Sequence, residues 1–178
     1  PGSTCVVVGA GGLRHIGVEC LRPLTAAAIV VLDANEAALE LARGWGADET
    51  VLADGARVAT VLDMTEGKGA EVVLDFVGER GAERDAWRMT RRAGSHFVIG
   101  YGGTVEVPTI DVISTERNVV GNLVGSYNDL AELMVLAQTG RVTLHTRPYP
   151  LDAVNEAMDD LNAGRLQGRG ILVPARAS

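Results

Sequence analysis

Lysine and cysteine are scarce in this sequence of 178 residues. Lys68 is the single lysine, so the sequence holds no Ser-x-x-x-Lys or Tyr-x-x-x-Lys pair that could carry catalysis. Two cysteines are present, Cys5 and Cys20, and each lies in an apolar run. We therefore expect small buried thiols in a reducing compartment, and neither a disulfide nor a cysteine metal site.

Basic charge and long apolar runs are also lacking. The 16 Lys and Arg residues against 23 Asp and Glu leave a formal net charge of −7, which argues against a nucleic-acid partner. The longest apolar run, residues 26–32, is too short to cross a membrane. No signal peptide is recognisable before the first apolar segment. We expect a cytoplasmic protein without a membrane or nucleic-acid partner.

Histidine is rare as well. His15, His96 and His145 are far apart in the sequence and show no metal-ligand spacing. We expect them to be structural or exposed, and we expect no metal site in this chain.

Short apolar runs alternate with helical patterns over the first two-thirds of the chain. In the segments between the first five runs, apolar residues recur at helical spacing. The six runs that predict strands are residues 4–8, 28–32, 50–52, 72–76, 96–100 and 118–123. This alternation predicts an α/β protein with a doubly wound Rossmann fold and a six-stranded parallel sheet.

The rest of the chain departs from this alternation. No helix is apparent between the last two predicted strands, and the segment from Thr104 to Val107 could form a short edge strand. In the final third, helical spacing predicts one helix around Leu133 and another around Met158, followed by a short strand at residues 171–173. We therefore expect a helical C-terminal extension.

The most informative local motif is the glycine turn at residues 9–14. Gly9 and Gly11 occupy the first two positions of G-x-G-x-x-G, directly after a buried strand and before an amphipathic helix. Gly9 permits the tight turn, and Gly11 lets a pyrophosphate approach the backbone at the positive end of the helix dipole. A purely structural glycine turn remains the alternative.

An acidic residue ends the second predicted strand. Asp33 follows Gly11 by 22 residues, near the interval of about 20 that is typical of dinucleotide-binding folds. A carboxylate there can accept both hydroxyls of the adenosine ribose and would repel the 2′-phosphate of NADP. The pair therefore predicts NAD as the cofactor.

Glycines also follow the later predicted strands, at Gly78, Gly100 and residues 121–125. They are consistent with close approach of the backbone to a ligand, and equally with ordinary turns. Asp75, inside a predicted strand, is expected to be hydrogen-bonded locally rather than catalytic.

Several segments taken together resemble zinc-dependent medium-chain alcohol dehydrogenases, and the resemblance covers essentially the whole chain. In order, they are GAGGLRHIGVECL, IVVLDANEAALELARGWGADETV, DFVGERGA, RRAGSHFVIGYGG, GNLVGSYNDLAELMVLAQTGRV and GRLQGRGILVP. The resemblance implies a longer parent protein in which a GroES-like domain, absent here, carries the catalytic zinc and binds the alcohol. Residues 1–124 would form the NAD-binding domain, and residues 125–178 would pack on the absent domain.

The resemblance also implies roles for individual residues. Gly9, Gly11, Gly12 and Leu13 would line the pyrophosphate, Asp33 would bind the adenosine ribose, Val77 and Gly78 would flank the adenosine, and Gly100, Tyr101, Leu123 and Val124 would approach the nicotinamide. No zinc ligand can be assigned to this chain.

Two residues depart from the family pattern. Arg14 stands where the third glycine of the motif usually lies, and Pro23 should end or kink the same helix. Arg14 either weakens NAD binding by spreading the helix from the sheet or adds a phosphate ligand. An Arg14→Gly variant separates these hypotheses, since it should strengthen binding in the first case and weaken it in the second.

The resulting hypothesis is the NAD(H)-binding part of an alcohol dehydrogenase, which interconverts a small alcohol with an aldehyde or ketone. This chain alone is expected to bind cofactor without turnover. A non-catalytic nucleotide-binding module and an S-adenosylmethionine-dependent methyltransferase are the alternatives. Zinc-free quinone reductases are a near relative, but Asp33 opposes the NADPH that they commonly prefer. The family forms dimers or tetramers, and Thr104 to Val107 is the candidate edge for pairing.

Overall fold

A computed structural model describes residues 2–9, 12–166 and 168–175 of the chain. Its main feature is a six-stranded sheet in the order β3-β2-β1-β4-β5-β6, with every neighbouring pair parallel. The strands are β1 (Thr4–Val8), β2 (Ala28–Asp33), β3 (Glu49–Leu52), β4 (Ala70–Asp75), β5 (Thr90–Val98) and β6 (Asn118–Gly121). The predicted doubly wound Rossmann fold is confirmed.

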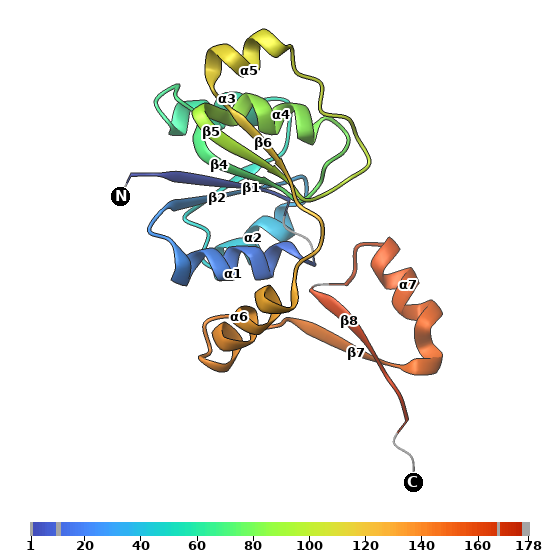
Figure 1. The fold of residues 1–178 in the computed structure, drawn as a ribbon. Helices are drawn as coiled ribbons and strands as arrows, with labels where there is room; N and C mark the ends of the chain where they lie inside the picture. The colour runs from blue at the N-terminus through green and yellow to red at the C-terminus, as the bar shows by residue number, and fades with distance from the viewer. Residues whose placement is uncertain (1, 10–11, 167, 176–178) are drawn as a thin grey trace.

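Helices cover both faces of this sheet. Helices α1 and α2 lie on one face, and α3, α4 and α5 lie on the other (Figure 1). Their bounds are α1 (Arg14–Leu24), α2 (Glu36–Gly44), α3 (Arg57–Met64), α4 (Ala82–Met89) and α5 (Thr109–Thr115). The strand order reverses between β1 and β4, so the loops that follow these two strands diverge and leave a crevice at the carboxyl end of the sheet.

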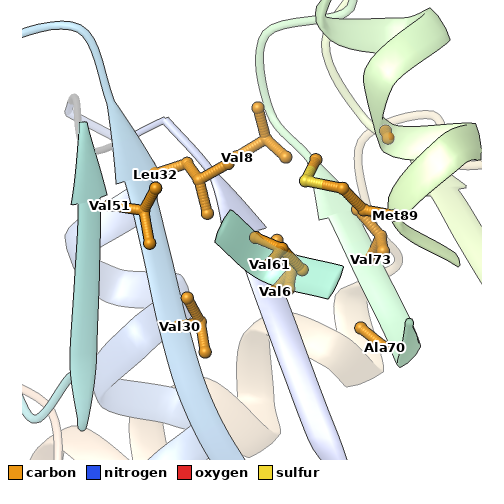
Figure 2. Packing of buried hydrophobic residues seen from close by; sticks show 10 residues of the cluster. Val6, Val8, Val30, Leu32, Val51, Val61, Ala70, Val73 and Met89 are labelled. Carbon is orange, nitrogen blue, oxygen red and sulfur yellow. The ribbon is translucent and has the colours of Figure 1, made fainter. Parts of the chain in front are cut away.

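The core is built on β1, whose alternate side chains enter two clusters. Val6 and Val8 pack with Val61 and Met89 on the side of α3 and α4, as Figure 2 shows. On the opposite face, a second cluster contains Cys5, Val7, Val18, Ile29, Val31, Leu39 and Ala42. Because both faces of β1 are covered, its sequence is a continuous apolar run rather than an alternating one.

The two cysteines differ in burial. Both Cys5 and Cys20 are free thiols. Cys5 is 4% exposed, and burial raises the pKa of its thiol to about 12. The prediction of small buried hydrophobic side chains is therefore confirmed for Cys5, whereas Cys20 is only partly buried.

The predicted edge strand is wrong. The segment from Thr104 to Val107 has no strand structure, and the two edge strands of the sheet are β3 and β6. A short helix, α5, connects β5 to β6 instead. Its sequence TIDVIST consists mainly of β-branched residues, which disfavour helix, so local propensity hid it. The proposed pairing of subunits through Thr104 to Val107 therefore loses its basis.

The C-terminal third is helical as predicted, with one additional strand. It contains α6 (Tyr127–Gln138), β7 (Thr146–Pro150), a 3₁₀ turn η1 (Leu151–Ala153), α7 (Val154–Asn162) and β8 (Arg169–Val173). The capping box of Ser126 and Asp129 begins α6. Strands β7 and β8 pair in parallel as a separate two-stranded sheet.

Strand β7 escaped prediction because its sequence is TRPYP. Proline cannot donate to a ladder and argues against a central strand. In a two-stranded sheet each strand has a free edge, so Pro148 and Pro150 are tolerated. Tyr149 anchors the strand, since its hydroxyl donates to Asp160 Oδ2 of α7 at 2.9 Å.

Helix α1 ends at Leu24, with Pro23 in its last turn, which agrees with the predicted stop. Within the described residues, the helices are all too short or too polar to traverse a lipid bilayer.

Candidate functional site

The glycine turn lies between β1 and α1, at the crevice. Gly9 has φ +97°, a left-handed conformation that favours glycine, and its N–H donates to the Leu32 carbonyl at 2.5 Å. Leu13 precedes α1 without a side-chain cap, and the first turn of the helix holds no acidic residue. The uncapped N–H groups and the positive dipole end are therefore available to an anion. Gly11 lies outside the described residues, and nothing is described of the Arg14 side chain.

Arg169 lies over this turn, although the two are far apart in the sequence. A Cβ placed on Gly12 would lie 2.7 Å from the Gly168 carbonyl oxygen and 3.3 Å from Arg169 Cδ. Arg169 Nη1 would be 3.7 Å from the same point. Gly12 thus leaves room for the C-terminal segment, which brings an exposed guanidinium to the N-terminus of α1. Sequence reasoning missed Arg169, because no fixed spacing connects it to the glycine motif.

A cavity of about 320 Å³ opens in the crevice next to the turn. Its lining is contributed by the ends of β1, β2 and β4 and by α3 and α4. The lining residues are Val8, Gly9, Leu32, Asp33, Ala34, Ala53, Arg57, Val77, Glu79, Arg80, Ala82, Asp85 and Met89. The structure therefore brings together Gly9, Asp33 and Val77, which the sequence had placed in one site.

Asp33 is held at the mouth of this cavity by the start of α2. Its Oδ1 accepts a hydrogen bond from the Asn35 N–H at 2.8 Å. Asn35 in turn caps α2 by accepting from the Ala37 N–H at 2.9 Å. The half-buried carboxylate therefore has a defined position at the end of β2.

A buried ion pair forms another wall of the cavity. Arg57 Nε donates to Asp85 Oδ2 at 2.8 Å, and Arg57 Nη1 donates to the Ala53 carbonyl at 3.0 Å. The Asp85 side chain is 8% exposed and that of Arg57 is 23% exposed. The pair joins α3 to α4 and to the loop after β3. Neither residue was a sequence candidate, because single charges on amphipathic helices carry no distinguishing pattern.

The turn after β4 is shaped by Asp75. Its Oδ1 accepts from the N–H groups of Val77 and Gly78, both at 2.9 Å. The prediction that Asp75 is hydrogen-bonded locally is confirmed. Its Oδ2 faces His96 Nε2 of β5 at 3.7 Å, and both side chains are fully buried. Burial opposes the charged form, but the His96 contact and the two N–H groups outweigh it and lower the pKa of Asp75.

Five other residues predicted for the site follow β4, β5 and β6 in the chain. Gly78 is buried with φ +62°, and its backbone contacts that of Gly100. Tyr101, Leu123 and Val124 are 93%, 90% and 95% exposed. None of these five residues lines the cavity beside Asp33.

Three aromatic rings pack beside the first turn of α1. The His15 ring centroid lies 5.4 Å from those of both Trp45 and His145. His15 is fully buried, which agrees with a structural histidine. Although the fold brings two histidines together, no group of three or more His, Cys, Asp or Glu side chains suited to a metal ion occurs in the described part of the chain.

Comparison with known proteins points to one family. Residues 12–139 match the family model described as zinc-binding dehydrogenase. The NAD-dependent alcohol dehydrogenase of Sulfurisphaera tokodaii is 31% identical over 98% of this chain, and D-arabinose 1-dehydrogenase (NADP(+)) of Saccharolobus solfataricus is 26% identical over 95%. The crystal structure of the alcohol dehydrogenase of Aeropyrum pernix superposes with a TM-score of 0.93 and 39% identity, covering 98% of this chain.

The matches have one further property in common. The chain covers 51% of the Sulfurisphaera protein, 49% of the D-arabinose dehydrogenase and 51% of the Aeropyrum structure. It thus spans about half the length of the curated relatives it matches.

Proposed function

The chain belongs to the zinc-binding dehydrogenase family, and from this membership we propose that it binds NAD(H) as the cofactor-binding part of an alcohol dehydrogenase. One observation carries the proposal: Asp33 and the N-terminus of α1 lie in the same crevice. Asp33 lines the cavity, and the uncapped N-terminus of α1 lies next to that cavity, with Arg169 over it. In this proposal the ribose acceptor and the pyrophosphate site are adjacent, as a dinucleotide requires.

The adenosine half would occupy the cavity of about 320 Å³. Asp33 would accept the ribose hydroxyls, and the apolar side chains of Ala53 and Val77 would lie against the adenine. A fixed carboxylate at this position favours NAD, because it repels the 2′-phosphate of NADP. Related proteins with either nucleotide in their names make this preference a point to test.

The pyrophosphate would lie on the glycine turn. There α1 would present its N–H groups, and Arg169, which lies over Gly12, would add a positive charge. Gly9, Gly11 and Leu13 belong to this proposed subsite. A lone guanidinium beside a helix N-terminus is repelled by the positive end of the helix dipole. An anion bound between the guanidinium and the helix N-terminus is attracted by both.

Bound NAD would supply the hydride acceptor at nicotinamide carbon C4. We place the nicotinamide beyond the pyrophosphate, towards Gly100, Tyr101, Leu123 and Val124, while Gly78 belongs to the adenosine side. The exposed side chains of Tyr101, Leu123 and Val124 would shield the reacting carbon from water. In this proposal the chain binds and orients the cofactor.

The reaction proposed for the parent protein interconverts a small alcohol with an aldehyde or ketone. The described residues hold no metal-binding group, so they do not fit a zinc site and no step is derived through one. We propose that the zinc ligands and most of the alcohol pocket lie in the half of the parent that this chain does not span. The 178 residues alone should then bind nucleotide without turnover.

We further propose that residues 1–124 form the nucleotide-binding domain and that residues 125–178 pack against the catalytic domain. Exposed apolar side chains in the second part support this division. They include Leu130, Met134, Val135, Leu144, Leu151, Val154, Met158, Leu161, Ile171, Leu172 and Val173. A surface of this kind is typical of an interface.

The methyltransferase alternative is disfavoured by the edge of the sheet. Strand β6 runs parallel to β5, whereas that class usually ends its sheet in an antiparallel hairpin. A non-catalytic nucleotide-binding module has the same cleft and remains an outcome of the test below.

Calorimetric titration with NADH, NADPH and S-adenosylmethionine tests the proposal. We expect NADH to bind at least about tenfold more tightly than NADPH and S-adenosylmethionine not to bind. Failure to bind NADH, or preferential binding of S-adenosylmethionine, would overturn it. Zinc-dependent alcohol turnover by these residues alone would contradict the assignment as the cofactor-binding part. A parent protein that binds NADH but oxidises no alcohol would support the non-catalytic module.

A further inference from the structure

Glu19 joins α1 to the C-terminal segment. Its Oε2 accepts a hydrogen bond from the Thr143 N–H at 2.8 Å, across 124 residues of sequence. Its Oε1 lies 3.6 Å from His145 Nε2, close enough for an ion pair when that imidazole is protonated. The Glu19 side chain is only 13% exposed. One carboxylate thus holds two residues of the loop that precedes β7.

The same loop determines where Arg169 lies. The Arg169 N–H donates to the His145 carbonyl at 2.9 Å, and Arg169 pairs with Thr146 in the register of β7 and β8. A Cβ placed on Gly168 would lie 2.1 Å from the His145 carbonyl oxygen, so the two chain segments are in direct contact. Any displacement of His145 from α1 would therefore displace Arg169.

Arg169 in turn lies over Gly12, two residues before the first residue of α1, the helix that also carries Glu19. The sequence of contacts runs from Glu19 to Thr143 and His145, then to Arg169, and back to the N-terminus of α1. It forms a closed loop in which α1 provides both the anchor and the anion site.

We propose that Glu19 is a positioning residue for the cofactor: by anchoring the loop before β7 to α1, it holds the Arg169 guanidinium over the pyrophosphate subsite. The inference rests on the proposed function, since it concerns that same subsite. Glu19 does not touch the nucleotide in this arrangement and acts through Arg169.

A role confined to stability is the competing explanation for the Glu19 contacts, and a double-mutant cycle separates the two. Dissociation constants for NADH are measured for the unaltered protein, Glu19→Ala, Arg169→Ala and the double variant. We expect each single variant to weaken NADH binding by about tenfold, the effect typical of one charge-assisted hydrogen bond. In the Arg169→Ala background, Glu19→Ala should have almost no further effect.

Glu132→Ala serves as the matched control. Glu132 is an exposed glutamate on α6, and it should leave NADH binding unchanged. Glu19→Gln is the conservative variant, because its amide oxygen still accepts from the Thr143 N–H. It should weaken binding by less than Glu19→Ala, about two- to threefold.

The outcomes are distinguishable. If Glu19→Ala weakens NADH binding equally with and without Arg169, or not at all, Glu19 is no positioning residue and the inference falls while the proposed function stands. If the unaltered protein does not bind NADH, the proposed function falls and the inference with it. If Glu19→Ala does not fold, the cycle of Glu19→Gln with Arg169→Ala decides by the same criterion.

Discussion

Gly78 and Gly100 lie backbone against backbone: a Cβ placed on Gly78 would lie 2.2 Å from both the carbonyl carbon and the carbonyl oxygen of Gly100. The reverse also holds, since a Cβ on Gly100 would lie 2.4 Å from the carbonyl carbon of Val77. The loops after β4 and β5 are thus in direct contact. Contact between chain segments is therefore sufficient to explain glycine at these two positions.

The first prediction follows from this contact. Gly78→Ala should reduce the free energy of unfolding by about 3 kcal/mol or more, since it combines a left-handed φ of +62° with a backbone clash. Urea denaturation measures the loss. Gly44→Ala is the control, because Gly44 lies in α2 with no atom within 4 Å of the added Cβ. It should be neutral or stabilising by up to about 1 kcal/mol, and equal losses in both variants would contradict the argument.

Asp33 should set the preference between NAD and NADP. Asp33→Asn retains an acceptor for the Asn35 N–H but removes the charge, so NADH binding should weaken by about tenfold. NADPH binding should weaken less or improve, because the repulsion of its 2′-phosphate is gone. Fluorescence titration with both nucleotides measures the ratio, with the exposed Asp63→Asn as control. An unchanged ratio would remove Asp33 from the proposed ribose subsite.

The Arg57–Asp85 pair should matter for stability mainly when it is broken on one side. The Asp85 side chain is 8% exposed in the unaltered protein, and Arg57→Ala removes its main partner. This substitution should reduce the free energy of unfolding by about 3 kcal/mol. Replacing both residues, as Arg57→Met with Asp85→Leu, should cost less than Arg57→Ala alone. Chemical denaturation of the three proteins tests this. Arg43→Ala, which breaks an exposed pair with Glu40, should change stability by less than about 1 kcal/mol. A larger loss in the double variant would refute the explanation.

Stability should depend on pH through His15. Burial is the main cause that lowers the pKa of His15 from its usual value of 6.5, with contributions from His145 and Arg169, while Glu19 and the Gly12 backbone act in the opposite direction. As pH falls through 6.5, the unfolded chain takes up a proton that the folded protein resists. The contribution of His15 to the free energy of unfolding is therefore fully present above pH 6.5. It decreases as the pH falls below 6.5, down to the lowered pKa of the folded state.

Thermal midpoints between about pH 7.5 and 5.5 measure this dependence, in a window above the usual carboxylate range. His15→Phe retains ring packing against Trp45 and should flatten the decrease. An equal slope in the variant would show that another group is responsible.

Prediction from sequence succeeded where local pattern and burial agree. The segment from β1 through α1 to Asp33 combines a continuous apolar strand, a glycine turn and apolar residues at helical spacing. Each of these patterns can be recognised from a few residues. It failed where local propensity conflicts with context. Helix α5 is rich in β-branched residues, which disfavour helix, and strand β7 contains two prolines, which disfavour strand. Both form because the surrounding structure tolerates these residues.

The sequence by itself determined the six-stranded Rossmann fold, the position of Gly9 at its turn and of Asp33 at the end of β2. These depend on periodicity and on residue types that a short segment reveals. Only the tertiary structure decided that Arg169 lies over Gly12, that Glu19 contacts Thr143, and that Arg57 pairs with Asp85. Each of these contacts joins segments that are not linked by any regular spacing in the sequence. The contacts therefore form only when the chain has packed into its tertiary structure.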